Sequence, residues 1–173
     1  MNDVLMIGGL HRNAGKTTFS GRVISSLAGD HRITAVKVTI FKGAHALETT
    51  PVLLPEERSD TGKDTARMLA AGAARVFWLK TDEPHMEEAL SLLQTLRDGN
   101  PLLVESNTLR RYCRPSLFYL VGREGEQSLK ESAREVMPMA DRTLTSTLDP
   151  RGEVLYFPNP RLMFQGGKWI ELS

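Results

Sequence analysis

A glycine-rich segment near the N-terminus has the residue types and spacing that bind a phosphate chain. It runs Gly9-Leu10-His11-Arg12-Asn13-Ala14-Gly15-Lys16-Thr17-Thr18. The apolar run Val4–Ile7 before it predicts a short buried strand, and the spacing of apolar residues over Lys16–Leu27 predicts a helix after it. Between a strand and a helix, a glycine-rich turn directs its backbone N–H groups at a phosphate, and the helix start adds partial positive charge. The segment therefore predicts a nucleotide phosphate site.

The last residues of this segment each have an expected role. Gly15 lets the backbone approach the phosphates closely, and Lys16 would reach the β- and γ-phosphates as a compact positive charge. Thr17 would offer its hydroxyl to Mg²⁺, and Thr18 would bond an α-phosphate oxygen. We therefore expect the ligand to be the Mg²⁺ complex of a nucleoside triphosphate.

One position departs from the general pattern G-x-x-x-x-G-K-[ST]. The first glycine of that pattern falls on Leu10, and Gly8 and Gly9 lie just before it. The alternative interpretation is a strand-turn-helix with an incidental Gly-Lys-Thr. At the loop tip, Arg12 would contact phosphate or reach a neighbouring subunit's nucleotide, and His11 would do so more weakly. An exposed loop residue without a catalytic role is an equal alternative for both.

Two acidic residues are candidates for the metal and the attacking water. Glu105 follows the apolar run Leu102–Val104, and the carboxyl end of a buried strand is where α/β sheets place ligand groups. Glu105 would hold the Mg²⁺ shell or polarise the water, with a surface carboxylate as the alternative. Asp64 lies at an expected helix start, where capping and a role near the γ-phosphate are both open. Lys37, on the polar face of a strand, is a site residue or a solvated lysine.

These residues leave the identity of the base open. Asp149 follows an expected strand, in the kind of loop where guanine-binding proteins place an aspartate. The Asn-Lys-x-Asp motif that accompanies such recognition is absent from the chain. Ser106 and Asn107 extend the strand of Glu105 and would shape the edge of the site.

Size and composition indicate one globular unit. With 173 residues, we expect a single domain over residues 1–173. The net charge of +1 gives no electrostatic argument for a nucleic-acid partner. No apolar run approaches the roughly 18 residues that cross a bilayer, so no membrane partner is expected. The single cysteine, Cys113, and an N-terminus without the features of a secretion signal favour the cytoplasm.

Strand-like and helix-like segments alternate along the chain. This predicts a three-layer α/β fold, with a mostly parallel central sheet flanked by helices. Further strands are expected over 33–40, 76–79, 102–104, 117–121 and 144–147, and helices over 63–71, 84–96 and 128–136. The stretch 41–62 lacks a steady period and predicts a long functional or mobile loop. The C-terminus predicts a β-hairpin around Gly166-Gly167, which would extend the sheet edge or serve in a dimer contact.

Three segments resemble one known family, the molybdopterin-guanine dinucleotide biosynthesis protein B (MobB) family of P-loop GTPases, in the signal-recognition and MinD group. Asn13-Ala14-Gly15-Lys16-Thr17-Thr18 is close to the family's phosphate loop. Gly62-Lys63-Asp64-Thr65, followed by Ala71-Gly72-Ala73, is similar to the family's Gly-Lys-Asp-Ser and Ala-Gly-Ala pair. Leu103-Val104-Glu105 is similar to the family's Val-Glu-Gly. Order and spacing agree over roughly the first 120 residues.

This resemblance implies GTP as the ligand, slow hydrolysis and a homodimer. It also implies that Asp64 lies beside the nucleotide, and that the protein assists the guanylyltransferase that attaches GMP to molybdopterin. Two features depart from the family. Its Lys-His-Thr-His segment is Lys37-Val38-Thr39-Ile40 in this chain, and the glycine after its acidic strand is Ser106. These changes indicate a divergent paralogue whose pathway can differ.

Three functional hypotheses follow. The first is a Mg²⁺-dependent GTPase of slow turnover, an accessory to molybdenum-cofactor maturation, in which Lys16, Glu105 and Asp64 carry the chemistry. The second is an ATP-using ligase or kinase akin to dethiobiotin synthetase and the cobyrinic acid amide synthases, which needs an organic acid substrate. The third is a nucleotide-gated binding protein whose 41–62 segment changes order with the γ-phosphate.

Overall fold

The computed structural model describes residues 1–42, 51–149, 154–156 and 161–172. Strands and helices alternate along most of this length, as the sequence predicts. In chain order the elements are β1 Val4–Gly9, α1 Lys16–Leu27, β2 Thr34–Phe41, β3 Val52–Pro55, α2 Asp64–Ala70, β4 Arg75–Asp82, α3 Met86–Thr95, β5 Leu102–Glu105, the 3₁₀ turn η2 Thr108–Arg111, β6 Leu117–Arg123, α4 Glu131–Val136, the 3₁₀ turn η3 Met137–Met139, β7 Arg142–Leu148, β8 Val154–Tyr156, β9 Arg161–Gln165 and β10 Lys168–Leu172.

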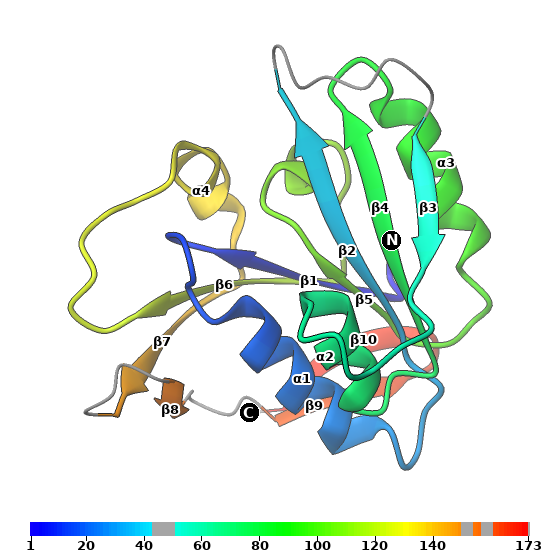
Figure 1. Ribbon diagram of the computed structural model, residues 1–173, viewed down its shortest axis with the longest axis horizontal. Helices are drawn as coiled ribbons and strands as arrows, with labels where there is room; N and C mark the ends of the chain where they lie inside the picture. The colour runs from blue at the N-terminus through cyan, green and yellow to red at the C-terminus, as the bar shows by residue number, and fades with distance from the viewer. Residues whose placement is uncertain (43–50, 150–153, 157–160, 173) are drawn as a thin grey trace.

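The main sheet has the order β3-β4-β2-β5-β1-β6-β7-β8 within the described residues (Figure 1). The strands from β4 to β7 run parallel, and β3 and β8 pair antiparallel at the two edges. Ile7 and Lys37 both lie opposite Glu105, one on each side of β5. The carboxyl ends of β2, β5 and β1 therefore meet at one edge of the sheet, where parallel α/β folds bind ligands.

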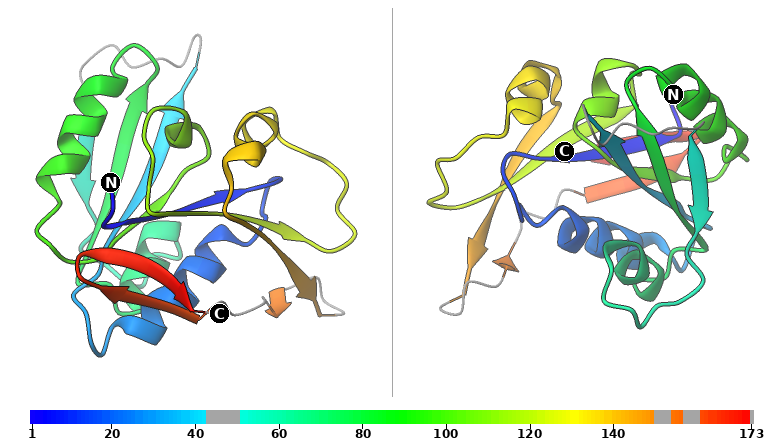
Figure 2. Two further views of the ribbon diagram at one scale, coloured as in Figure 1. Left: turned by 180° about the vertical axis from the view of Figure 1, so that it is seen from behind. Right: turned by 45° about the horizontal axis from the view of Figure 1, so that its top comes forward.

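Helices cover both faces of the sheet and make three layers. Helices α1 and α2 lie side by side on one face, and α3, η2 and α4 lie on the other (Figures 1 and 2). Every residue of β1 is buried, with Leu5 and Ile7 in the core under α1 and Met6 in the opposite core. Burial on both faces explains why this strand reads as a continuous apolar run in the sequence. No described helix has the length and apolar content needed to cross a membrane.

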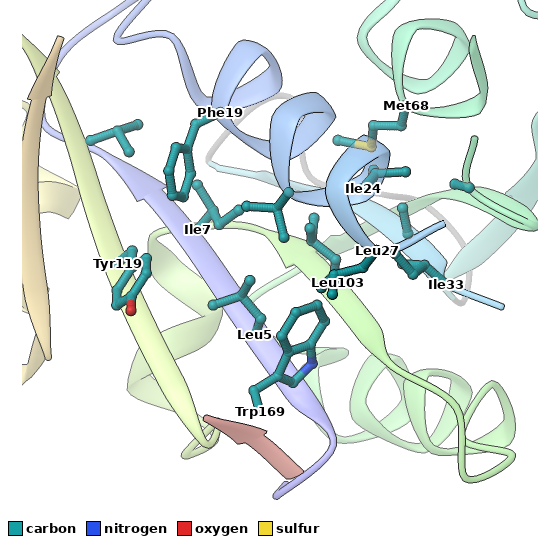
Figure 3. Close-up of a cluster of buried hydrophobic side chains, with 14 of the residues drawn as sticks. Leu5, Ile7, Phe19, Ile24, Leu27, Ile33, Met68, Leu103, Tyr119 and Trp169 are labelled. Carbon is teal, nitrogen blue, oxygen red and sulfur yellow. The ribbon is translucent and has the colours of Figure 1, made fainter. Parts of the chain in front are cut away.

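The C-terminal hairpin forms its own two-stranded sheet and does not extend the edge of the main sheet. Gly166 and Gly167 both have positive φ, as a two-residue hairpin turn requires. Trp169 packs beside Leu5 in the core under α1, and its indole N–H donates to the Asp3 carbonyl at 3.0 Å (Figure 3). The predicted hairpin is confirmed. Of its two predicted roles, extension of the sheet edge is wrong, because the Trp169 indole anchors the hairpin over the face of the main sheet that α1 covers.

Two further differences from the sequence prediction concern short elements. The stretch 41–62, predicted to be a loop, contains β3, which pairs with β4 at the sheet edge. Four exposed or half-buried residues are too few to show a strand periodicity. Residues 43–50 of that stretch lie outside the described residues, so the proposed ordering of this segment stays a prediction. Helix α4 begins at Glu131 rather than at 128.

The anchoring role of Trp169 predicts the effect of truncating it. Trp169→Ala removes an indole that is 3% exposed, together with its hydrogen bond to Asp3, and should lower the free energy of unfolding by about 3 kcal/mol or more. Ile170 on the same strand is 37% exposed, so Ile170→Ala should cost less than about 1 kcal/mol. Urea unfolding measures both. Equal losses in the two variants would contradict the packing of this hairpin.

Candidate nucleotide site

The loop between β1 and α1 presents unpaired backbone donors at the carboxyl edge of the sheet. From Asn13 to Thr18, no backbone N–H group donates to an acceptor among the described residues. Two of these residues have positive φ, Asn13 at 52° and Gly15 at 84°. Successive residues in such conformations turn their N–H groups toward one point and form an anion-binding concavity. The loop thus has the geometry predicted for a phosphate site, and Gly15 is required by its backbone conformation.

The start of this loop is held by a side-chain amide from the next strand. Asn107, just after β5, accepts a hydrogen bond from the Gly9 N–H at 2.7 Å and donates to the Gly9 carbonyl at 2.9 Å. Asn107 Oδ1 would lie only 2.7 Å from a Cβ added at Gly8, so the absence of a side chain there admits the amide. Asn107 was predicted to lie at the edge of the site. Its contact with Gly9 joins residues far apart in the sequence and depends on the pairing of the strands.

The missing first glycine of the loop pattern has a structural explanation. Leu10 does not have positive φ, so its backbone does not require glycine. Its N–H donates to the Val121 carbonyl at 2.9 Å, and its carbonyl accepts from the Lys130 N–H at 2.8 Å. The Leu10 side chain lies over Gly122, where an added Cβ would approach it to 2.8 Å. A glycine on β6 therefore compensates for the leucine in the loop.

His11 holds the loop and does not face a phosphate. The Arg123 N–H donates to His11 Nε2 at 2.8 Å, so Nδ1 carries the proton and donates to the Arg12 carbonyl at 3.0 Å. The His11 side chain is buried. The predicted weak phosphate contact of His11 is therefore wrong, because both ring nitrogens are already engaged. Arg12 is exposed at the loop tip.

Glu105 lies buried between the strand edge and helix α1. Its Oε1 accepts from Ser20 Oγ at 2.6 Å, and its Oε2 accepts from Thr17 Oγ1 at 3.2 Å. Burial raises the pKa of Glu105, against the opposing effects of the Ser20 hydrogen bond and the Lys16 charge. The surface-carboxylate alternative is therefore wrong, since Glu105 is 2% exposed. Ser20, which carries no motif in the sequence, reaches Glu105 one helical turn after the loop.

Asp64 is the first residue of α2 and forms an ion pair with Lys37 of β2. Burial opposes ionisation of Asp64, but the hydrogen bond and charge of Lys37, with the charge of Lys16 nearby, outweigh it and lower the pKa of Asp64. The carboxylate is thus charged and turned toward the loop. Lys37 therefore lies at the site, in an ion pair with Asp64, and its side chain stays 33% exposed.

The loop and α2 enclose a first cavity of about 270 Å³. It is lined by the loop from Asn13 to Thr18, together with Asp64 and Arg67. Arg67, which was not predicted from the sequence, donates to Thr18 Oγ1 at 3.1 Å. This hydrogen bond brings an arginine to the end of the phosphate loop. The predicted residues Asn13, Ala14, Gly15, Lys16, Thr17 and Thr18 are therefore brought together around one space.

The oxygen atoms around Thr17 suit magnesium. They come from one hydroxyl and two carboxylates, those of Glu105 and Asp64, and hard oxygen donors are what Mg²⁺ prefers. No cluster of three His, Cys, Asp or Glu side chains occurs in the described part of the chain. These residues would therefore hold Mg²⁺ together with phosphate oxygens and waters, as is usual for this ion, rather than in an all-protein cage.

A second cavity of about 320 Å³ lies beside the first and shares Lys16 and Asp64 with it. Its other walls come from the end of β2, from the residues after β5 and from the start of α4. Lys130 and Ser132 line it, and neither was predicted from the sequence. No local motif marks them, because only the parallel order of β5, β1 and β6 brings α4 to this edge.

The comparisons with known proteins identify the fold. No protein-family model and no curated protein matches the chain. Among solved structures, the chain is similar to LpxK from Aquifex aeolicus, determined in complex with ATP, with a TM-score of 0.51 at 16% identity. The match covers 82% of this chain and 47% of that one, so the chain spans about half the length of LpxK.

The chain shares an α/β fold with this structure. The predicted fold class, with its mostly parallel sheet and flanking helices, is thereby confirmed. The resemblance to the MobB family stays a prediction, because an identity of 16% to another protein shows the fold alone.

The buried carboxylate predicts a pH dependence of stability. Burial raises the pKa of Glu105 above its ordinary 4.5, so in the window above 4.5 the folded chain keeps a proton that the unfolded chain has lost. Stability should therefore fall as pH rises through this window, and the fall should be absent in Glu105→Gln. Urea unfolding at a series of pH values, with EDTA to remove metal, measures the difference.

Two comparisons make this measurement specific. Asp64 contributes in the opposite sense, because its lowered pKa makes stability fall as pH drops below its ordinary 3.8. Glu88→Gln, an exposed carboxylate on α3, should keep the wild-type slope. An identical slope in wild type and Glu105→Gln would contradict the assignment of the buried proton.

Proposed function

We propose that the chain binds the Mg²⁺ complex of a nucleoside triphosphate at the β1–α1 loop and cleaves its γ-phosphate. The observation that carries this proposal is the row of unpaired N–H groups from Asn13 to Thr18 around Lys16. A turn and the first turn of a helix that leave their N–H groups without internal acceptors form a ready site for an anion. The neighbouring carboxylates supply the oxygen donors for the metal.

Each group has a defined part in this reaction. Lys16 and the loop N–H groups neutralise the phosphate oxygens. Thr17 and Glu105 would hold Mg²⁺, which would supply positive charge to the phosphates when bound. Glu105 is suited to this task because its cost of burial is relieved when a cation lies beside it. Asp64, kept ionised by Lys37, orients the attacking group at the other side of Lys16.

The specific form that we propose is slow GTP hydrolysis in support of molybdenum-cofactor guanylation. Its support is the resemblance of Asn13–Thr18, Gly62–Thr65 and Leu103–Glu105 to the MobB family. In this form the partner is the molybdenum-cofactor guanylyltransferase, the compartment is the cytoplasm, and a homodimer would let Arg12 act on its own nucleotide or on the partner subunit's. Asp149 follows the carboxyl end of β7, on the loop edge of the sheet, and is the candidate for guanine contact.

A second candidate is ATP-dependent transfer of the γ-phosphate to an organic acceptor. It is favoured by the second cavity, which gives an acceptor a place beside Lys16 and Asp64. LpxK, whose fold is similar, was determined in complex with ATP. Hydrolysis needs no such cavity, so the two candidates differ in whether turnover depends on a second substrate.

Equilibrium binding of Mg²⁺ complexes of GTP and ATP tests the site. A charge-assisted contact contributes about 1.5–3 kcal/mol, so Lys16→Ala should weaken binding roughly tenfold to a hundredfold. Lys168→Ala, which removes the same charge from an exposed position on the hairpin, should bind like wild type. Calorimetric titration of the three proteins gives the dissociation constants.

The pattern of results separates the alternatives. A strong preference for GTP that Lys16→Ala abolishes supports the GTPase, and a preference for ATP supports the transfer reaction. Unchanged affinity in Lys16→Ala would refute the phosphate loop as the binding site.

A further inference from the structure

The second cavity carries a chemical signature of its own. Its wall combines three lysines, Lys16, Lys37 and Lys130, with the carboxylates of Asp64 and Glu105. Lys37 is paired with Asp64, and Glu105 is buried and bonded to Ser20 and Thr17. The wall therefore has one more positive charge than negative when all five groups are ionised. An excess of positive charge in a concave space attracts anions.

Of the three lysines in this wall, Lys16 belongs to the phosphate loop and Lys37 is paired with Asp64, so Lys130 is the cation that neither accounts for. No hydrogen bond or ion pair of its ammonium group occurs among the described residues, and the side chain is half-buried. Burial and the nearby positive charges of Lys16 and Arg12 lower the pKa of Lys130. Its backbone is fixed meanwhile, because the Lys130 N–H donates to the Leu10 carbonyl at 2.8 Å.

Hydroxyl donors lie on the same wall. Ser132 Oγ accepts a hydrogen bond from Asn107 Nδ2 at 3.3 Å, so its own proton is available to a ligand. Thr108, the first residue of η2, adds a second hydroxyl. A cation flanked by hydroxyl donors is the arrangement that holds a carboxylate or a phosphate group.

Two apolar side chains complete the lining, and the volume of the cavity sets the size of its occupant. Val38 and Ile40 at the end of β2 line the cavity and are only partly buried in the core beneath. At about 30 Å³ for each water-sized unit, the cavity of about 320 Å³ holds roughly ten non-hydrogen atoms. A short carbon skeleton with an anionic group fits both the charged and the apolar walls.

We propose that this cavity is a second binding site, for a small organic anion whose carboxylate or phosphate group is held by Lys130, Ser132 and Thr108. The proposal rests on nucleotide binding at the adjacent loop, because the shared residues Lys16 and Asp64 place the anion beside the γ-phosphate. It makes the anion the second substrate in the transfer form of the function. It also assigns a role to Lys130, which the nucleotide site does not use.

The test is a titration of the protein that is already saturated with Mg²⁺ and the non-hydrolysable β,γ-imido analogue of GTP or ATP. With the phosphate loop filled, inorganic phosphate and malonate are added in separate experiments, and backbone amide shifts are followed by NMR. We expect saturable shifts at Thr108, Lys130 and Ser132 with at least one of the two anions. The more effective anion identifies the group that the site prefers.

Three variants give the result its meaning. Lys130→Gln should weaken anion binding about tenfold or more, Lys130→Arg should retain it, and Lys168→Gln, which removes a distant exposed charge, should match wild type. Nucleotide affinity should stay the same in all three. Shifts that do not saturate, or equal anion affinity in wild type and Lys130→Gln, would overturn the proposal.

Failure of the second site and failure of the nucleotide site give different signals. The amides from Asn13 to Thr18 report the nucleotide, and those of Thr108, Lys130 and Ser132 report the anion. Loop shifts with the triphosphate but none at the second set with either anion would overturn the second site alone. Absence of loop shifts with the triphosphate would overturn the nucleotide site, on which this proposal rests.

Discussion

A loop that binds phosphate through its backbone cannot satisfy that backbone internally, and this constraint organises the structure around residues 9–18. The N–H groups from Asn13 to Thr18 must stay free, so the loop has to be held from outside and at its beginning. Asn107 holds both backbone groups of Gly9, and β6 and the residue before α4 hold both groups of Leu10. The neighbours of β1 in the sheet therefore position the loop and leave its tip available.

The charged side chains at the sheet edge, like the backbone groups of the loop, divide into those with a partner and those without one among the described residues. The ion pair with Lys37 compensates the charge of Asp64 close to the loop, and hydrogen bonds from Ser20 and Thr17 hold the buried Glu105 beside it. Lys16, which lines both cavities, and Lys130, which lines the second, supply the positive charge that no carboxylate pairs with among the described residues. Two adjacent cavities that share Lys16 and Asp64 are what a reaction between a nucleotide and a second molecule requires.

The parts of the site that could be predicted from sequence depend on local order. The loop and α1 are contiguous in the sequence, so a motif was enough to predict the phosphate loop. Glu105 lies at the end of an apolar strand, so a short apolar run was enough to predict its place. The contact of Asn107 with Gly9 joins residues 98 positions apart, and Lys130 reaches the site only through the parallel pairing of β6. Likewise the Gly166-Gly167 turn predicted the hairpin, but only the packing of Trp169 shows which face it covers. The edge strand β3 has too few residues for a detectable period.

The central claim is that the free N–H groups of the loop are the ligand site, and amide hydrogen exchange measures them directly. Exchange is followed residue by residue in the metal-free protein and after addition of Mg²⁺ with GTP or ATP. Slower exchange confined to Asn13–Thr18, with Gly9 and Leu10 already protected before addition, is the predicted result. Nucleotide binding that leaves exchange from Asn13 to Thr18 unchanged would contradict the account.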